Sequence, residues 1–147
     1  MRKLFVSLAV TATVFGIGAA PAEAATKPVL FTYVYVDSPG KDDRSAASLN
    51  KEYFRITNQL NRPVGLKDWS VKDAAGKVFR FGNVTLPKKG SFIVHTGKGT
   101  QGKPAGHFYW GSGNYIWNNT GDTATLRSPS GATMDTCKWK KVVTTKC

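Results

Sequence analysis

Residues 29–36 read VLFTYVYV, and this stretch decides the fold class. It is dense in β-branched and aromatic residues, which favour extended strands. Successive side chains of a strand point to opposite faces, so alternation places Phe31, Tyr33 and Tyr35 on one face and the intervening residues on the other. The pattern predicts a strand that is buried on at least one side.

Similar short stretches recur along the chain, separated by turns rich in Gly, Pro, Asp and Asn. They predict strands at 52–58, 66–71, 77–81, 84–86, 91–96, 124–127 and 133–139. The segments 37–50 and 97–113 are rich in turn-forming residues, so we expect long loops there. No window shows a sustained helical period. Many short strands joined by glycine and proline turns predict an all-β sandwich or barrel.

The first 24 residues have the layout of a secretory signal peptide. Arg2 and Lys3 precede an uncharged run from 4 to 20, and Ala22-Glu23-Ala24 supplies the small residues of a cleavage site. The run is shorter than the roughly 20 residues of a membrane span, and no second run follows. We therefore expect residues 1–24 to be removed and residues 25–147 to form one secreted, extracellular domain without a transmembrane segment. The alternative is a retained signal-anchor helix.

The chain is strongly basic, with 21 Lys and Arg against 9 Asp and Glu and a net charge of +12. Without Arg2, Lys3 and Glu23 of the predicted signal peptide, 19 basic and 8 acidic residues remain, a net charge of +11. A field of this size attracts polyanions. The candidate partners are nucleic acid such as extracellular DNA, anionic cell-wall polymers and acidic cell-envelope surfaces. The alternative is a soluble protein that its charge merely keeps dispersed, and in either case we expect a monomer.

Lysines are most concentrated near the C-terminus. Lys138, Lys140 and Lys141 flank Trp139, and Lys146 follows. This group is the best local candidate for a polyanion contact. Alternatively, these lysines protect an edge strand from pairing with another chain.

Both cysteines, Cys137 and Cys147, lie in the last eleven residues. In an exported chain this predicts a disulfide, which would tie the C-terminal tail to the last predicted strand. A metal site is the alternative, although no histidine lies nearby to complete a ligand set.

The aromatic residues divide into two groups. Trp69, Trp117 and Trp139 fall on or beside predicted strands, so we expect them in the core. Trp110 and Tyr115 belong to a glycine-rich region, where exposed rings could stack on sugars or bases.

Four carboxylates, those of Asp37, Asp42, Asp43 and Glu52, lie close in sequence around one predicted loop. Such a group suits a hard cation, so calcium is the one candidate cofactor. The spacing does not follow the twelve-residue calcium loop. The alternative is a solvated turn in which Asp37 and Asp42 bind nearby backbone amides.

Catalytic motifs are absent from the sequence. His95 and His107 are the only histidines, and neither has a partner at catalytic spacing in the sequence. A metal-dependent nuclease built from His107 with Asn118 or Asn119 would need a further carboxylate or histidine. We therefore predict that the protein is not an enzyme and that His95 ends a strand facing solvent.

Several short motifs, in this order and spacing, form a recognisable set. They are Glu52-Tyr53-Phe54-Arg55-Ile56-Thr57-Asn58, Leu66 with Trp69, Asp73 with Gly76, Leu86-Pro87 with Gly90, Tyr109-Trp110-Gly111, Ile116-Trp117-Asn118-Asn119 and Gly121-Asp122-Thr123-Ala124-Thr125-Leu126. The set resembles the lamin-tail domain family over nearly all of the predicted mature chain.

The resemblance implies an immunoglobulin-like β-sandwich that acts as an interaction or structural module and has no catalytic set of its own. It also suggests that Trp110, Tyr115 and their aromatic neighbours cap one end of the sandwich. Bacterial relatives often accompany secreted nucleases, so the alternative function is a secreted enzyme or a nuclease-associated accessory.

Overall fold

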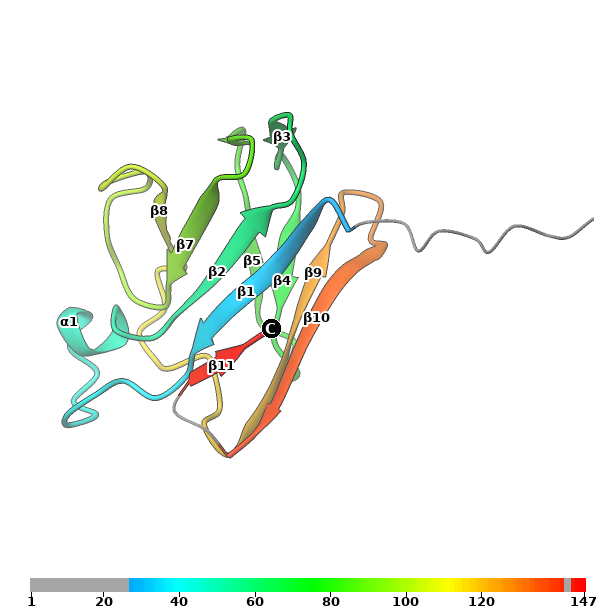
Figure 1. The fold of residues 1–147 in the computed structure, drawn as a ribbon. Coiled ribbons are helices and arrows are strands. Elements are labelled where there is room, and N and C mark those ends of the chain that lie inside the picture. Colours follow the sequence, from blue (N-terminus) through cyan, green and yellow to red (C-terminus); the bar gives the residue numbers. More distant parts are fainter. Residues whose placement is uncertain (1–26, 142–143) are drawn as a thin grey trace, which may run out of the picture.

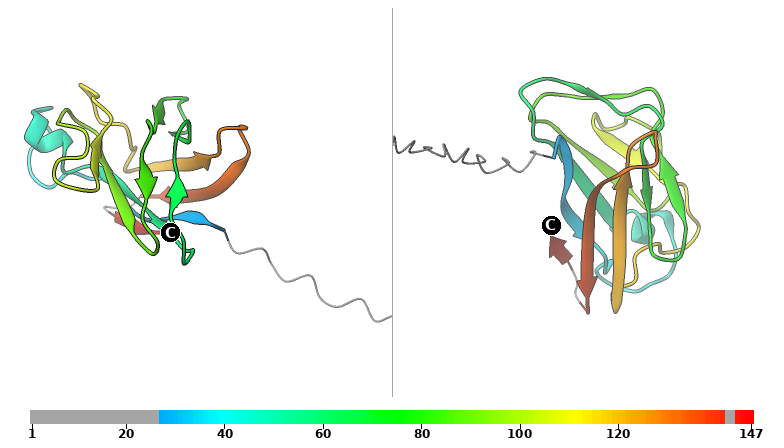
Figure 2. Two further views of the ribbon diagram at one scale, coloured as in Figure 1. Left: turned by 90° about the horizontal axis from the view of Figure 1, so that it is seen from above. Right: turned by 90° about the vertical axis from the view of Figure 1, so that its right-hand side faces the viewer.

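The computed structural model describes residues 27–141 and 144–147 (Figure 1). The predicted signal peptide, residues 1–24, lies outside the described residues. The described chain forms two main sheets that enclose the core, as Figure 2 shows from two further sides. The predicted all-β sandwich is confirmed.

The larger sheet has five strands in the order β11-β1-β2-β7-β8. Their bounds are Thr144–Lys146 for β11, Val29–Tyr35 for β1, Tyr53–Asn58 for β2, Ser91–His95 for β7 and His107–Tyr109 for β8. The β7–β8 pair is parallel and the other pairs are antiparallel.

The second sheet has four strands in the order β10-β9-β4-β5. Their bounds are Thr133–Lys140 for β10, Gly121–Arg127 for β9, Ser70–Lys72 for β4 and Val78–Arg80 for β5. A separate pair, β3 (Val64–Gly65) and β6 (Thr85–Leu86), and one short helix, α1 (Ala46–Leu49), complete the described elements.

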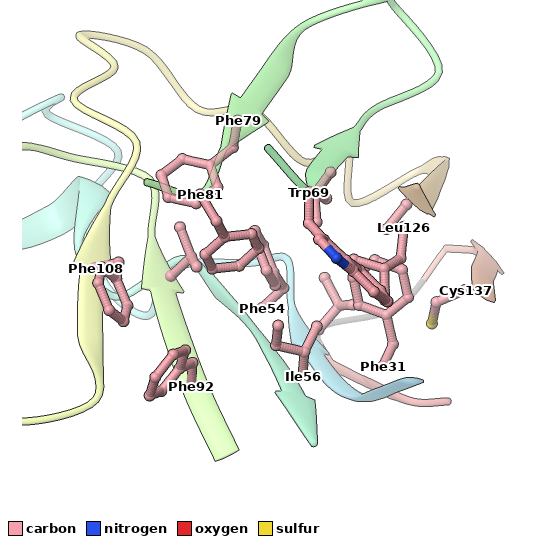
Figure 3. Close-up of a cluster of buried hydrophobic side chains, with 14 of the residues drawn as sticks. Phe31, Phe54, Ile56, Trp69, Phe79, Phe81, Phe92, Phe108, Leu126 and Cys137 are labelled. Carbon is pink, nitrogen blue, oxygen red and sulfur yellow. The ribbon is translucent and has the colours of Figure 1, made fainter. Parts of the chain in front are cut away.

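The core is built around the ring of Phe54, which is fully buried on β2 (Figure 3). Phe31 of β1 and Phe79 of β5 meet this ring edge to face, with centroids 5.8 and 6.3 Å away. Each such ring contributes about 1.5–3 kcal/mol through burial alone. The predicted core positions of Trp69, Trp117 and Trp139 are confirmed, since these three are at most 8% exposed.

A β-bulge in β1 makes one sequence prediction wrong. Phe31 was expected to share a face with Tyr33 and Tyr35, but the pairing with β2 shifts by one residue between Phe31 and Tyr33. Phe31 is therefore buried together with Val34, whereas Tyr33 and Tyr35 are half-buried on the outer face. An extra residue in one strand reverses the alternation that follows it.

Two predicted loops contain regular structure. Segment 37–50 includes α1, whose first turn is capped by the Ser45 hydroxyl accepting a hydrogen bond from Ser48 N. Segment 97–113 includes β8, and β11 was not predicted at all. Both strands are only three residues long and depend on pairing with β7 and β1, which local alternation does not reveal.

The predicted disulfide is confirmed, and it joins Cys137 of β10 to Cys147 just after β11. The two Cα atoms are 5.5 Å apart. Because β10 and β11 belong to different sheets, the bridge fastens one sheet to the other at the edge of the sandwich.

Replacing both cysteines, Cys137→Ala with Cys147→Ala, should lower the free energy of unfolding by roughly 2.5–3 kcal/mol, the loop-closure entropy of about ten residues. Urea unfolding followed by tryptophan fluorescence measures this loss. Reducing the unmodified protein should give a similar loss, and an unchanged unfolding midpoint in both cases would contradict the prediction.

Candidate functional site

The outer face of the four-stranded sheet carries basic side chains from every strand. Lys138 and Lys140 of β10 are exposed, while the residues that alternate with them, Cys137 and Trp139, are buried. In the right-hand view of Figure 2, β9 and β10 lie side by side toward the viewer. The strand that carries the predicted lysines is thus an edge strand of this sheet.

The pairing of residues between adjacent strands shows that this face continues across β9, β4 and β5. Thr136 of β10 opposes Thr125 of β9, which opposes Lys72 of β4. Residues directly opposite each other share a face, so Lys72 lies on the same side of the sheet as the β10 lysines. One row further along, Ser70 separates Arg127 of β9 from Arg80 of β5. We call the set Lys72, Arg80, Arg127, Lys138 and Lys140 the basic face.

Acidic residues of the same sheet point the other way. Asp135 of β10 is 8% exposed, and its Oδ2 accepts a hydrogen bond from the backbone N of Phe31 at 2.8 Å. Its Oδ1 accepts from Lys27 Nζ, also at 2.8 Å, the one ion pair within residues 27–141 and 144–147. Asp122 opposes the buried Trp139 and accepts backbone hydrogen bonds from Ala74 and Thr123. The basic face therefore has no carboxylate in its rows to neutralise it.

The C-terminal lysines do not form one group. Lys138 and Lys140 belong to the basic face, and Lys141 is exposed just beyond β10. Lys146 instead opposes Tyr33 on the five-stranded sheet. Because β10 and β11 belong to different sheets, lysines that are close in sequence lie on different sheets.

Trp110 packs against the core, with its ring centroid 5.8 Å from that of Phe79 and 5.7 Å from that of Trp117. The Tyr115 hydroxyl forms a hydrogen bond with Ser48 Oγ at 2.7 Å. These contacts agree with the capping position that the resemblance suggested. A ligand-stacking role for Trp110 and Tyr115 stays a prediction.

Of the four carboxylates expected around calcium, three line one pocket and the fourth, Asp43, lies ahead of α1. Asp43 Oδ1 accepts a hydrogen bond from Ser45 N ahead of α1, and hydrogen bonding by Ser45, first through its side chain and then through its backbone, lowers the pKa of Asp43. Asp37 and Asp42 line a pocket of about 460 Å³ whose wall includes Glu52. Within the described ranges, no three His, Cys, Asp or Glu side chains are close enough together to hold a metal ion. Calcium binding by Asp37, Asp42, Asp43 and Glu52 stays a prediction.

Glu52 is fully buried and connects three distant segments of the chain. Its Oε1 accepts hydrogen bonds from Thr96 Oγ1 at 2.6 Å, Ile116 N at 2.7 Å and Trp117 N at 3.2 Å. Oε2 has no hydrogen-bond partner in the described part of the chain. Burial raises the pKa of Glu52 to about 7, although the three donors act in the opposite direction.

The two histidines form a pair that sequence reasoning missed. His95 Nδ1 donates to the backbone carbonyl of Asn50 at 2.7 Å, which leaves Nε2 to accept from His107 Nδ1 at 2.8 Å. His95 ends β7 as predicted but is half-buried, and burial, reinforced by His107, lowers its pKa. Only the parallel pairing of β8 with β7 brings the two residues together.

Comparison with known proteins identifies the family. Residues 22–141 match the family model described as Lamin Tail Domain. The match spans most of the chain, so the protein belongs to the lamin tail domain family, whose members have an immunoglobulin-like fold and are often binding or structural domains. No curated protein matches the chain. In the part of the chain that the structure describes, no helix is long and apolar enough to cross a membrane.

Glu52 should make the stability of the protein depend on pH. Its pKa is about 7 in the folded protein against 4.5 ordinarily, so its contribution is fully present below about pH 4.5 and is lost as pH rises through about 7. The loss amounts to about 3 kcal/mol. Glu52→Gln keeps an oxygen acceptor but stays neutral, so it should lack this loss.

Urea unfolding of the unmodified protein and of Glu52→Gln at pH 5 and pH 8 tests this, because other titrating groups are common to both proteins. Parallel pH dependence of the two unfolding free energies would contradict the assignment to Glu52.

Proposed function

We propose that this protein is a non-catalytic, extracellular binding module whose basic face binds phosphate-rich polymers. The observation that carries the proposal is the segregation of charge by the four-stranded sheet. Five cations from four strands point outward, and the two carboxylates in the strands of this sheet, Asp122 and Asp135, lie on the opposite side.

Such a face suits a repeating anion better than a single small one. Its cations are spread over neighbouring strands, which lie about 4.8 Å apart, and none of them lines the pocket of about 460 Å³ beside Glu52. Backbone phosphates of a polymer can meet several such cations at once and release condensed counterions. We expect binding that is independent of base sequence, because phosphate contacts position a ligand without reading bases.

DNA and an anionic wall polymer share this chemistry, and both are partners in the proposal. The disulfide supports an extracellular location, since such bonds persist in oxidising compartments. The family supports a role without catalysis. Secretion through the signal peptide predicted at residues 1–24 is part of the same proposal.

Duplex DNA binding should therefore weaken steeply with salt, and neutralising the basic face should flatten that dependence. For Lys138→Gln with Lys140→Gln, the slope of log affinity against log salt should decrease by about 2, or roughly 0.9 per lost phosphate contact. Fluorescence anisotropy between about 50 and 200 mM salt measures the slope.

A matched control removes the same charge elsewhere. Lys88 and Lys98 are exposed outside the basic face, in the turn before β7 and in the loop after it. Lys88→Gln with Lys98→Gln should change the slope much less. Equal effects of the two double variants would show that only net charge matters and would contradict a binding face.

Two further experiments distinguish DNA from a wall polymer as the ligand and test for catalysis. Poly(glycerol phosphate) competing for the same lysines would identify phosphate as the shared determinant, whereas competition by DNA alone would restrict the proposal to nucleic acid. Plasmid DNA incubated with the protein and magnesium or calcium should stay intact. Cleavage would contradict the non-catalytic role.

A further inference from the structure

The outer face of the five-stranded sheet bears a continuous row of aromatic side chains. Tyr35 of β1 opposes Tyr53 of β2, Tyr53 opposes His95 of β7, and His95 lies beside Tyr109 of β8. All four are half-buried, so each ring presents part of its surface to solvent. The row crosses four adjacent strands (Figure 1). We call these four residues the aromatic row.

Neighbouring rings in the aromatic row touch. The centroids of Tyr35 and Tyr53 are 5.6 Å apart with 12° between the ring planes, those of Tyr53 and His95 are 5.8 Å apart, and those of His95 and Tyr109 are 5.1 Å apart. With 12° between their planes the rings of Tyr35 and Tyr53 are nearly parallel, and at 5.6 Å they are displaced sideways, so each leaves part of the other's face uncovered. The rings therefore support one another, and few side-chain conformations remain to be lost on binding.

A second row beside the first supplies positive charge. Lys146 of β11 opposes Tyr33 of β1, and Tyr33 opposes Arg55 of β2. The Arg55 guanidinium lies 5.8 Å from the centre of the Tyr33 ring, and its Nε donates to Thr32 Oγ1 at 2.9 Å. Arg55 and Lys146 are exposed, and neither row contains an acidic residue.

We propose that this sheet face, formed by the aromatic row with Arg55 and Lys146, is a second binding site, specific for single-stranded nucleic acid. Aromatic rings on an open sheet stack on unpaired bases, and adjacent cations meet the backbone phosphates. A duplex hides its bases within the helix, so it cannot use the rings. The site is separate from the basic face, which lies on the other sheet.

The charge of the face selects this ligand over a neutral glycan. Sugar rings also stack on tyrosines, but a neutral polymer would gain no charge attraction from Arg55 and Lys146. The ring spacing of 5.1–5.8 Å exceeds the about 3.4 Å between stacked bases of one strand. The geometry therefore fits a single nucleic-acid strand that is stretched out along the aromatic row.

Affinity for an oligothymidylate of about fifteen nucleotides tests the proposal, with duplex DNA of equal length measured under the same salt. Tyr35→Leu with Tyr53→Leu removes two stacking rings and keeps apolar side chains on the strands. It should weaken single-strand binding at least about tenfold and leave duplex binding unchanged. Tyr35→Phe with Tyr53→Phe retains the rings and should bind nearly as the unmodified protein does.

Crosslinking of the unmodified protein provides a test that does not depend on how the variants fold. Irradiation with a bromodeoxyuridine-substituted oligonucleotide should label peptides that carry Tyr35, Tyr53 or Tyr109. Labels confined to the basic face, unchanged single-strand affinity of the leucine variant, or equal losses for both DNA forms would overturn the proposal. The proposal would also be overturned if a glucan or a protein protected the aromatic row and the oligonucleotide did not. Loss of duplex binding in the double variant Lys138→Gln with Lys140→Gln would test the basic face and would leave the proposal for the aromatic row unaffected.

Discussion

A one-residue slip of any strand would exchange its buried and exposed side chains, because successive residues face opposite ways. Burial of Phe54 and Ile56 therefore forces Tyr53 and Arg55 outward on β2, and burial of Cys137 and Trp139 forces Lys138 and Lys140 outward on β10. The apolar interior thus determines both outer faces. Every basic residue within a described strand lies on an outer face, while Asp122 and Asp135 share the side of their sheet with core residues.

Glu52 is the polar exception that completes the interior. A buried carboxylate is costly, yet here it satisfies two backbone N–H groups and a hydroxyl that would otherwise lack partners. It joins the start of β2 to the end of β7 and to the loop that carries Ile116 and Trp117. That loop packs Trp117 against Phe54 and Trp139, so the carboxylate also helps to close one end of the core.

Much of this arrangement could be predicted from the sequence. Alternation located the longer strands, the cysteines predicted the bridge, and the motifs from Glu52 to Leu126 indicated the family. Sequence reasoning failed where pairing is non-local. The bulge in β1 reversed the expected face of Phe31, and the short strands β8 and β11 exist only through their neighbours. Lys72, Arg80 and Arg127 are far from the C-terminal lysines in sequence, so only the sheet register could add them to the same face.

The central claim is that charge segregation by the four-stranded sheet creates a binding surface for phosphate polymers. Titration of the isotope-labelled protein with duplex DNA, followed by amide chemical shifts, tests it most directly. The account predicts that the largest shifts cluster on β10, β9, β4 and β5 around Lys72, Arg80, Arg127, Lys138 and Lys140. Shifts centred on Lys88 and Lys98, or spread evenly over the molecule, would contradict it.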